Sequence, residues 1–541
     1  MKSSELLVQC LESEGVKYVF GLPGEENIGF LNALSSSNIE FILTHDERWA
    51  AFMANAYGRL SGKPGVCLST LGPGATNLIT GVADALLDFS PMVAITGQTG
   101  LAKMHKESHQ RVDTLSTFRP VTKWNARIEI PETIPEIVRK AFKTASIEKP
   151  GPTHIEFPED ISEVDTHGTP LSQTSVRYPE PTQDMIAGAV SMINNARLPL
   201  ILAGQGVIRG KAVRELKEFV SRTKIGVTTT FMGAGGLPAD DECFVSTVGL
   251  QSKDYISCGF DRADLIIAIG YDPVEFSPRL WNKDADKQII HIDLTPAEID
   301  VDYPSYELLG DIKTTLSMIT ERIAFDRDVS YYQRLKLYVD HALHFSASGF
   351  PLKPLRIIGD IRKALGRKDI LISDVGAHKI WIGRFYPAYE ENTVLISNGF
   401  ASMGFAIPTA ISAKLLHPDR NIIAAVGDGG FLMSMCEINT AVRLGLSFVC
   451  LIFNDGGYGL VEWKERLRYN RDFFVKFGNP DFVKLAESFG ASGYRVTAED
   501  ELLPVVRDAL KQKKPAIIDC PVDYSENIKL TEKLGRLICP L

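Results

Sequence analysis

The sequence lacks the features that mark membrane, extracellular and nucleic-acid-binding proteins. It has no uninterrupted apolar stretch long enough to span a membrane and no run of like charges. Its eight cysteines form no C-x-x-C pair, and residues 1–15 contain no apolar core of a signal peptide. The net charge of −9 over 541 residues is mild and offers no basic surface. These absences predict a soluble, cytoplasmic protein with buried free thiols and with no membrane or nucleic-acid partner.

The composition, 45% apolar and 23% charged, is typical of a globular protein, and the length suits about three domains. Short β-branched runs alternate with amphipathic segments, which predicts an α/β fold of parallel sheets with helices on both faces. Linkers are indicated where Pro, Ser, Thr and Glu gather at 160–184 and where Gly, Pro and Ser gather at 346–354. We therefore predict three domains, 1–165, 185–340 and 350–541. The predicted strands are 16–21, 41–43, 66–70, 92–96, 153–158, 198–203, 265–270, 289–293, 422–426, 448–453 and 517–521.

One stretch, 421–460, carries the clearest chemical signal. A buried strand predicted at 422–426 leads into the turn Gly-Asp-Gly-Gly at 427–430. Apolar residues at helical spacing follow, and a second buried strand at 448–453 ends in Asn-Asp-Gly-Gly at 454–457. This is a β-α-β unit with glycine and an acid at the carboxyl end of each strand. Ligands of open α/β sheets bind at those ends.

These turns suit a diphosphate held through a divalent cation. Glycines let backbone N–H groups approach phosphate oxygens, and a following helix N-terminus favours anions. Asp428 and Asp455 are hard oxygen donors of the kind that Mg²⁺ prefers. Taken singly, each is equally an ordinary Asp-Gly turn. Taken together, the two turns with the helix and strand between them resemble the thiamine diphosphate binding motif.

Glu47 has a structural and a catalytic interpretation. Thr44 and Glu47 have the spacing of a capping box, in which Glu47 serves only to cap a helix. The alternative is a buried carboxyl group that exchanges a proton with the aminopyrimidine ring of thiamine diphosphate. That exchange is what allows the cofactor to lose the proton from its thiazolium carbon.

Nearly the whole chain resembles the acetolactate synthase family, thiamine-diphosphate-dependent enzymes of the pyruvate-oxidase-like group. In the first domain the resemblance is carried by FGLPG at 20–24, HDERWAAFMANAYGR at 45–59, LGPGATNLITG at 71–81 and HKESHQRVDTLSTFRPVTKWN at 105–125. It implies that 1–165 is a pyrimidine-binding domain, with Glu47 as the catalytic glutamate. It also implies that Gln110 is a second catalytic and substrate-contacting residue, where composition alone suggests a solvated side chain.

In the third domain the resemblance is carried by SDVGAHKIW at 373–381 and SNGFASMGFAIPTA at 397–410. It implies that 350–541 is the diphosphate-binding domain and that Met403 is an apolar wedge under the cofactor, although methionine more often fills a core. The implied metal ligands are Asp428, Asp455 and the carbonyl of Gly457. The implied cofactor-binding residues are Pro23, Gly24, Glu47, Gly376, Ala377, His378, Gly399, Ala401, Met403, Gly427, Asp428, Gly429, Gly430, Asp455, Gly457 and Tyr458.

Two details resemble the catabolic type of this family, which carries no FAD. They are YDPVEFSPRLWN at 271–282 and an aspartate at position 455, where the biosynthetic type has asparagine. Gly204-Gln205-Gly206 follows a strand like a dinucleotide-binding turn, but the third glycine is out of register, so we predict that FAD is absent. Phe400, Ala401 and Trp463 depart from the family pattern at positions implied to face the substrate.

The resemblance implies an enzyme that uses thiamine diphosphate and Mg²⁺ to decarboxylate pyruvate and condense the two-carbon unit with a second pyruvate, giving 2-acetolactate. It further implies a homodimer, or a dimer of dimers, with the active site at the subunit interface. The motifs leave open another 2-keto acid carboligase or decarboxylase with a different donor or acceptor. A non-catalytic homologue conflicts with the intact Glu47, Asp428 and Asp455. A nicotinamide-dependent oxidoreductase lacks the acidic residue expected after the turn at 204–206.

Overall fold

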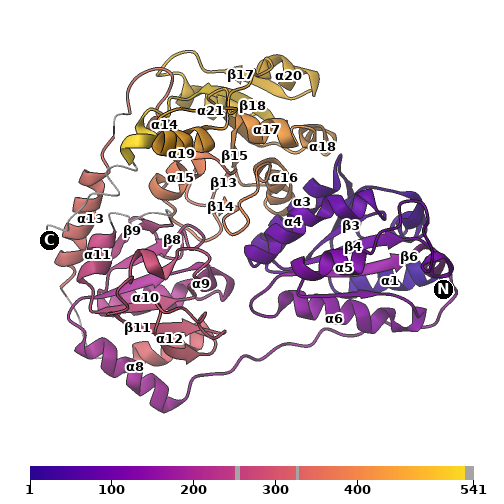
Figure 1. Cartoon of the computed structure of the whole chain (residues 1–541), viewed down its shortest axis with the longest axis horizontal. Coiled ribbons are helices and arrows are strands. Elements are labelled where there is room, and N and C mark those ends of the chain that lie inside the picture. Colours follow the sequence, from indigo (N-terminus) through magenta and orange to yellow (C-terminus); the bar gives the residue numbers. More distant parts are fainter. Residues whose placement is uncertain (250–255, 324–327, 346, 531–541) are drawn as a thin grey trace.

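The computed structural model describes residues 1–249, 256–323, 328–345 and 347–530. Figure 1 shows three α/β blocks, which we call the N-terminal, central and C-terminal blocks, each with helices packed around one sheet. Each sheet has six strands, and every pairing between these strands is parallel. The predicted α/β class is therefore confirmed.

The N-terminal block has the strand order β2-β1-β3-β4-β6-β5. Its strands are β1 (Tyr18–Gly21), β2 (Glu40–Leu43), β3 (Gly65–Ser69), β4 (Met92–Gln98), β5 (Trp124–Arg127) and β6 (Pro152–Pro158). Its helices are α1 (Ser3–Ser13), α2 (Ile28–Leu34), α3 (Glu47–Ser61), α4 (Pro73–Leu87), α5 (Thr114–Phe118), α6 (Ile134–Ser146) and α7 (Glu159–Ser162).

The central block has the order β12-β11-β10-β7-β8-β9. Its strands are β7 (Pro199–Ala203), β8 (Val227–Thr230), β9 (Phe244–Val248), β10 (Leu265–Ile269), β11 (Gln288–Asp293) and β12 (Tyr306–Leu309). Its helices are α8 (Gln183–Asn195), α9 (Gln205–Arg209), α10 (Val213–Thr223), α11 (Ser257–Arg262), α12 (Ile312–Arg322) and α13 (Ser330–Ala342).

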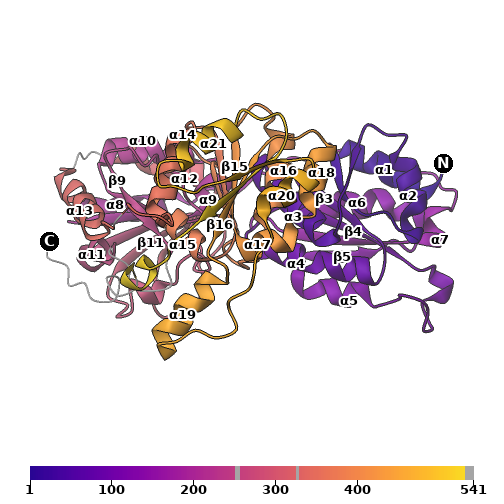
Figure 2. The same ribbon diagram turned by 90° about the horizontal axis from the view of Figure 1, so that it is seen from above.

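The C-terminal block has the order β14-β13-β15-β16-β18-β17. Its strands are β13 (Ile370–Ser373), β14 (Val394–Ile396), β15 (Ile422–Gly427), β16 (Val449–Asn454), β17 (Ser492–Arg495) and β18 (Ala516–Pro521). Its helices are α14 (Pro354–Ala364), α15 (Ala377–Phe385), α16 (Ala406–Leu416), α17 (Asp428–Ser434), α18 (Glu437–Arg443), α19 (Gly459–Tyr469), α20 (Phe482–Ser488) and α21 (Leu502–Ala509). Figure 2 shows α19 standing away from the sheet of this block.

Each strand predicted from the sequence is present, with ends shifted by no more than a few residues. Of the strands at the sheet edges, the sequence predicted only β2. Edge strands such as β5, β12 and β17 are short and only partly buried, so they carry no continuous apolar run. The strands β8, β9, β13 and β14 were also not predicted.

The helix predicted after Asp428 is divided into α17 and α18. Between them Met435 and Cys436 keep right-handed helical dihedrals. The hydrogen bonds there tighten to three-residue spacing, with Ile438 N donating to Met435 O at 3.0 Å and Asn439 N to Cys436 O at 3.1 Å. The apolar periodicity was thus correct, and a 3₁₀-type turn interrupts the helix.

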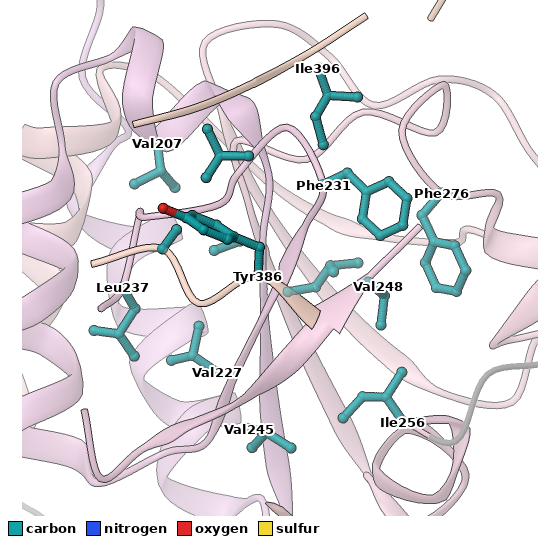
Figure 3. Close-up of a cluster of buried hydrophobic side chains, with 14 of the residues drawn as sticks. Val207, Val227, Phe231, Leu237, Val245, Val248, Ile256, Phe276, Tyr386 and Ile396 are labelled. Carbon is teal, nitrogen blue, oxygen red and sulfur yellow. The ribbon is translucent and has the colours of Figure 1, made fainter. Parts of the chain in front are cut away.

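The blocks share hydrophobic cores across their boundaries. α3 of the N-terminal block packs along α16, where Phe52 and Phe405 meet edge to face at 5.8 Å. Figure 3 shows Phe231 and Val207 of the central block beside Tyr386 and Ile396 of the C-terminal block, all within one buried cluster. Because both boundaries of the C-terminal block bury large apolar side chains, this block holds the other two in place.

The cysteine prediction is confirmed in part. Six cysteines are free, and all but Cys436 are buried: Cys10, Cys67, Cys243, Cys436, Cys450 and Cys520. The prediction is wrong for Cys258, which is disulfide-bonded. Cys539 lies outside the described residues. Among the described helices, none has both the length and the apolar character of a membrane span.

The glycines of the turn at 204–206 allow β7 and β10 to approach closely at their carboxyl ends. A Cβ on Gly206 would lie 2.5 Å from Gly270 Cα. We expect Gly206→Ala to lower the free energy of unfolding by about 1–3 kcal/mol, because the backbones must separate. Thermal or urea unfolding measures the loss. Gly359→Ala in α14 is the control, since nothing lies within 4 Å of its Cβ; an equal loss in both variants would contradict the steric explanation.

Candidate functional site

Glu47 is the first residue of α3, directly after β2 ends. Its side chain is only 8% exposed, and its Oε2 accepts a hydrogen bond from Asn77 Nδ2 of α4 at 3.0 Å. The predicted capping box with Thr44 is not formed. Asp46 caps the helix instead, accepting from Arg48 N at 2.8 Å. The Glu47 carboxylate is therefore not required as a helix cap.

Loops from neighbouring strands surround this carboxylate. A Cβ on Gly74 would lie 3.0 Å from Glu47 Oε1, so the glycine keeps room beside the acid. Gly72 has φ +50° and its missing Cβ would meet the Gln110 backbone oxygen at 2.3 Å. The structure thus brings Gln110 to the same edge of the sheet as Glu47, with its own side chain exposed.

Pro23 and Gly24 lie in the turn after β1, at this same edge. Gly24 packs against Thr70, because a Cβ on Gly24 would lie 2.4 Å from the Thr70 Cβ. The backbone N–H of Gly24 donates to Asn27 Oδ1 at 2.9 Å. Pro23 is exposed. The carboxyl ends of β1, β2 and β3 therefore gather the N-terminal residues predicted to bind the cofactor.

The two acidic turns of the C-terminal block meet at the carboxyl ends of adjacent strands β15 and β16. Asp428 Oδ1 accepts from Gly429 N at 2.8 Å, and its Oδ2 accepts from Gly456 N at 2.7 Å. Burial raises the pKa of Asp428, and burial together with the Asp428 carboxylate raises the pKa of Asp455 to about 7. A buried carboxylate that raises the proton affinity of its half-buried neighbour fits a divalent cation, which would relieve the repulsion.

His378 lies beside these turns in the first turn of α15. Its ring stacks on Phe453 with centroids 5.3 Å apart, and burial lowers the pKa of His378 to about 3, so the imidazole is neutral. Within the described residues its Nε2 is buried without a hydrogen-bond partner. Gly376 and Gly427 flank the ring, with missing Cβ atoms 2.9 and 3.4 Å from His378 Cε1. This orphaned nitrogen, between two glycine turns, fits a phosphate oxygen.

Gly429 and Gly430, in the turn at 427–430, let side chains from other segments approach the backbone closely. A Cβ on Gly429 would lie 2.7 Å from Tyr458 Cε1 and 3.4 Å from Met403 Cε. A Cβ on Gly430 would contact Asp374 at 3.3 Å. Met403 and Tyr458 thus reach over the acidic turns from two different segments. Ala377 begins α15, and Gly457 lies in the turn between β16 and α19.

The segment 397–405 is held at both ends by buried aspartates. At one end Asp88 accepts from Gly399 N at 2.7 Å and from Asn398 N at 3.2 Å. At the other end Asp374 accepts from Gly404 N at 2.9 Å. Between these anchors Ala401 adopts φ +57°, which costs an L-residue energy. The anchors fix the backbone that carries Met403.

Three of the residues predicted to contact the substrate, Gln110, Phe400 and Trp463, lie in different surroundings. Phe400 is 44% exposed, and Gln110 is exposed at the edge of the N-terminal sheet. Trp463 of α19 is buried in the hydrophobic core and borders a cavity of about 330 Å³ that also touches Asp455 and Tyr524. Among the described residues, no hydrogen bond, ion pair or ring contact joins Trp463 to Phe400, or Glu47 to the acidic turns.

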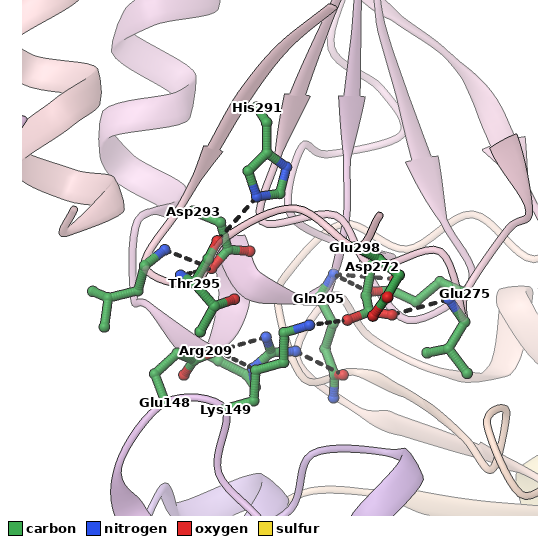
Figure 4. Close-up of polar contacts among 12 residues, drawn as sticks. Glu148, Lys149, Gln205, Arg209, Asp272, Glu275, His291, Asp293, Thr295 and Glu298 are labelled. Carbon is green, nitrogen blue, oxygen red and sulfur yellow. Dashed lines mark hydrogen bonds and ion pairs between the residues drawn. The ribbon is translucent and has the colours of Figure 1, made fainter. Parts of the chain in front are cut away.

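A polar network fills the region around the turn at 204–206. Figure 4 shows Arg209 paired with Glu148, at 2.6 Å, and Gln205 beside it. Lys149 pairs with Asp272 in the same network. A cavity of about 890 Å³ lies between the blocks at this place. Gln205, Arg209 and Glu148 line this cavity and contact one another within it.

Sequence reasoning missed the residues that support the site. Asn77, Asp88 and Asp374 contact the predicted functional segments through hydrogen bonds, as does Asn479, described below. A signal exists for Asp88, because it follows a helical run and is followed by Phe-Ser-Pro, which cannot continue that helix. Nothing local distinguishes Asn479 from an ordinary loop residue.

Comparisons with known proteins agree with the three-sheet architecture. Family models described as the N-terminal, central and C-terminal domains of thiamine pyrophosphate enzymes match residues 1–117, 186–319 and 374–520. The chain is 37% identical to an acetolactate synthase of Bacillus subtilis, covering 99% of this chain and 97% of that protein. It is 35% identical to a catabolic acetolactate synthase of Raoultella terrigena, covering 98% and 97%. It is 31% identical to an acetolactate synthase large subunit of Haemophilus influenzae, covering 98% and 96%.

Proposed function

Because the chain belongs to the acetolactate synthase family of thiamine pyrophosphate enzymes, we propose that it converts two pyruvate molecules into 2-acetolactate and CO₂. The observation that carries this proposal is the pair formed by the buried Asp428 and the half-buried Asp455 at the ends of β15 and β16. They lie beside the neutral His378 and the glycine turns, as a metal-bound diphosphate requires.

Each of the three blocks has a separate proposed role. We propose a pyrimidine-binding domain at 1–165, a central domain at 185–340 and a diphosphate-binding domain at 350–541, a division that the three separate sheets support. Asp428, Asp455 and the carbonyl of Gly457 would hold Mg²⁺. Thiamine diphosphate, when bound, supplies a thiazolium that accepts the electron pair released by decarboxylation.

The remaining tasks belong to this chain's own side chains. The Glu47 carboxyl group exchanges a proton with the cofactor's aminopyrimidine, and Asn77 holds that carboxyl in place. Met403, on a segment anchored by Asp88 and Asp374, would provide an apolar contact to the cofactor. Because no covalent bond to a side chain is needed, the protein contributes orientation and the exclusion of water.

We propose that two subunits complete each site. Large apolar side chains near the acidic turns are exposed in the single chain, including Phe400 at 44%, Met433 at 41% and Tyr458 at 36%. A second copy that covers them would bring its Glu47 to the C-terminal block of its partner. These exposed side chains support a homodimer, or a dimer of dimers, in which each site uses two chains. We propose the cytoplasm as its location on the sequence prediction alone.

We further propose that FAD is absent, because the turn at 204–206 lacks the third glycine of a dinucleotide-binding turn in register. The test is to incubate the purified protein with thiamine diphosphate, Mg²⁺ and pyruvate, then convert acetolactate to acetoin with acid and quantify it. We expect acetolactate without added FAD and a protein solution without flavin absorbance. Carbon dioxide with acetaldehyde, but no acetolactate, would contradict the proposed acceptor and would direct attention to Phe400 and Trp463.

A further inference from the structure

A neutral amide from a distant loop contacts the predicted metal carboxylate. Asn479 lies between α19 and α20, and its Nδ2 donates to Asp428 Oδ2 at 2.7 Å and to Asn454 Oδ1 at 3.0 Å. Asp428 follows β15 and Asn454 ends β16, so one side chain bridges the two acidic turns. We propose that Asn479 is a positioning residue for the metal ion, an inference that rests on the proposed function.

The backbone next to Asn479 is anchored on the metal-ligating turn. Tyr458 N donates to Val475 O at 3.0 Å, and Phe477 N donates to Gly456 O at 3.1 Å. These bonds flank Gly457, whose carbonyl is a predicted ligand. The segment 475–479 therefore contacts the turn that contains Asp455 through its backbone. It contacts the Asp428 carboxylate through the side chain of Asn479.

Lys476 adds a contact to Asp455, the remaining predicted ligand. Its Nζ lies 3.4 Å from the backbone oxygen of Asp455 and 2.5 Å from a Glu462 carboxylate oxygen. The Lys476 ammonium group thus forms an ion pair with Glu462 at the rim of the site. The amide of Asn479, by contrast, is half-buried at the acidic turns themselves.

The chemistry of the amide explains why this residue type suits the position. A lysine or arginine on Asp428 would neutralise the carboxylate and compete with a cation. An amide N–H fixes the orientation of the carboxylate but leaves its negative charge in place. Among the described residues the carbonyl oxygen of Asn479 is buried without a partner, so the two donor contacts alone set the orientation of the amide. Hydrogen-bond partners of this kind typically change metal affinity by about 10–100-fold.

The test compares Asn479→Ala and Asn479→Leu with the wild-type protein. Leucine has nearly the same shape but no donor, so it separates the lost hydrogen bonds from a lost side chain. Mg²⁺ is titrated in the presence of fixed thiamine diphosphate, and binding is followed by tryptophan fluorescence and by the rise in melting temperature. We expect the apparent Kd for Mg²⁺ to rise about 10–100-fold in both variants, with kcat recovering at saturating Mg²⁺.

Two controls separate positioning from a general structural role. Asn195→Ala, at the exposed end of α8, should leave Mg²⁺ affinity unchanged. The metal-free melting temperatures of the Asn479 variants should stay close to that of the wild type. A variant that loses kcat and metal-free stability while Mg²⁺ affinity stays unchanged would overturn the proposal. Failure of the wild type itself to bind Mg²⁺ and thiamine diphosphate would overturn the proposed function instead.

Discussion

Replacing Asp428 by alanine should nearly abolish binding of Mg²⁺ and, with it, binding of thiamine diphosphate. Asp428 is fully buried and oriented by the N–H groups of Gly429 and Gly456. In the proposed site it is the fully buried carboxylate ligand, so its removal would take away one of the two charged ligands. We expect a loss of metal affinity greater than about 100-fold, the upper end of the loss seen when only an outer hydrogen-bond partner is removed. Isothermal titration of Mg²⁺ with cofactor present measures it.

Two further variants make this result specific. Asp428→Asn keeps the shape and the acceptor oxygen but removes the charge, so it should also lose metal affinity while the fold is retained. Asp419→Ala removes an exposed carboxylate shortly before β15 and should bind Mg²⁺ normally. Unchanged Mg²⁺ affinity in Asp428→Ala would refute the assignment of this residue as a ligand.

Replacing Glu47 by glutamine should slow turnover severely while the cofactor still binds. The amide oxygen of glutamine can still accept the hydrogen bond from Asn77, so the local packing is preserved. It cannot exchange a proton, and loss of acid–base catalysis typically costs about 10²–10⁴-fold in rate. Steady-state kinetics should show a lower kcat, and a titration of thiamine diphosphate should show near-normal affinity. Glu40→Gln, at the exposed start of β2, is the control; near-normal turnover in Glu47→Gln would disprove the catalytic role.

Mixing the two inactive proteins tests whether the site is shared between subunits. If Glu47 acts with the acidic turns of its partner, a mixed dimer of Glu47→Gln and Asp428→Ala chains has one site with both defects and one intact site. After random exchange of equal amounts, about a quarter of the wild-type activity should return, since half of the dimers are mixed and half of their sites are intact. If both residues served the same site from one chain, no activity would return.

The sequence by itself determined the elements that carry the chemistry. β15 and β16 are buried on both faces, so they appear as continuous apolar runs, and the turns that end them are marked by glycine and aspartate. The sequence also placed Glu47 immediately after a strand. Because parallel strands end at one edge, these residues could be assigned to binding edges without knowledge of the packing.

Other features depended on tertiary structure. The sequence left Glu47 with two interpretations, and only the structure showed Asp46 as the helix cap. The edge strands β5, β12 and β17 escaped prediction because they are only partly buried and carry no continuous apolar run. Both outcomes depend on how far neighbouring elements bury each residue. The periodicity of a short segment does not indicate that burial.

The partners of the buried polar groups were decided by tertiary structure alone. Asp88 reaches Gly399, more than 300 positions further along the chain, and Asn479 bridges Asp428 and Asn454 from a separate loop. A hydrogen bond between side chains of distant elements leaves no repeating pattern, because it depends on the packing of whole helices and sheets. The sequence therefore indicated the residues that are predicted to meet the cofactor, whereas the fold decided which residues hold them in position.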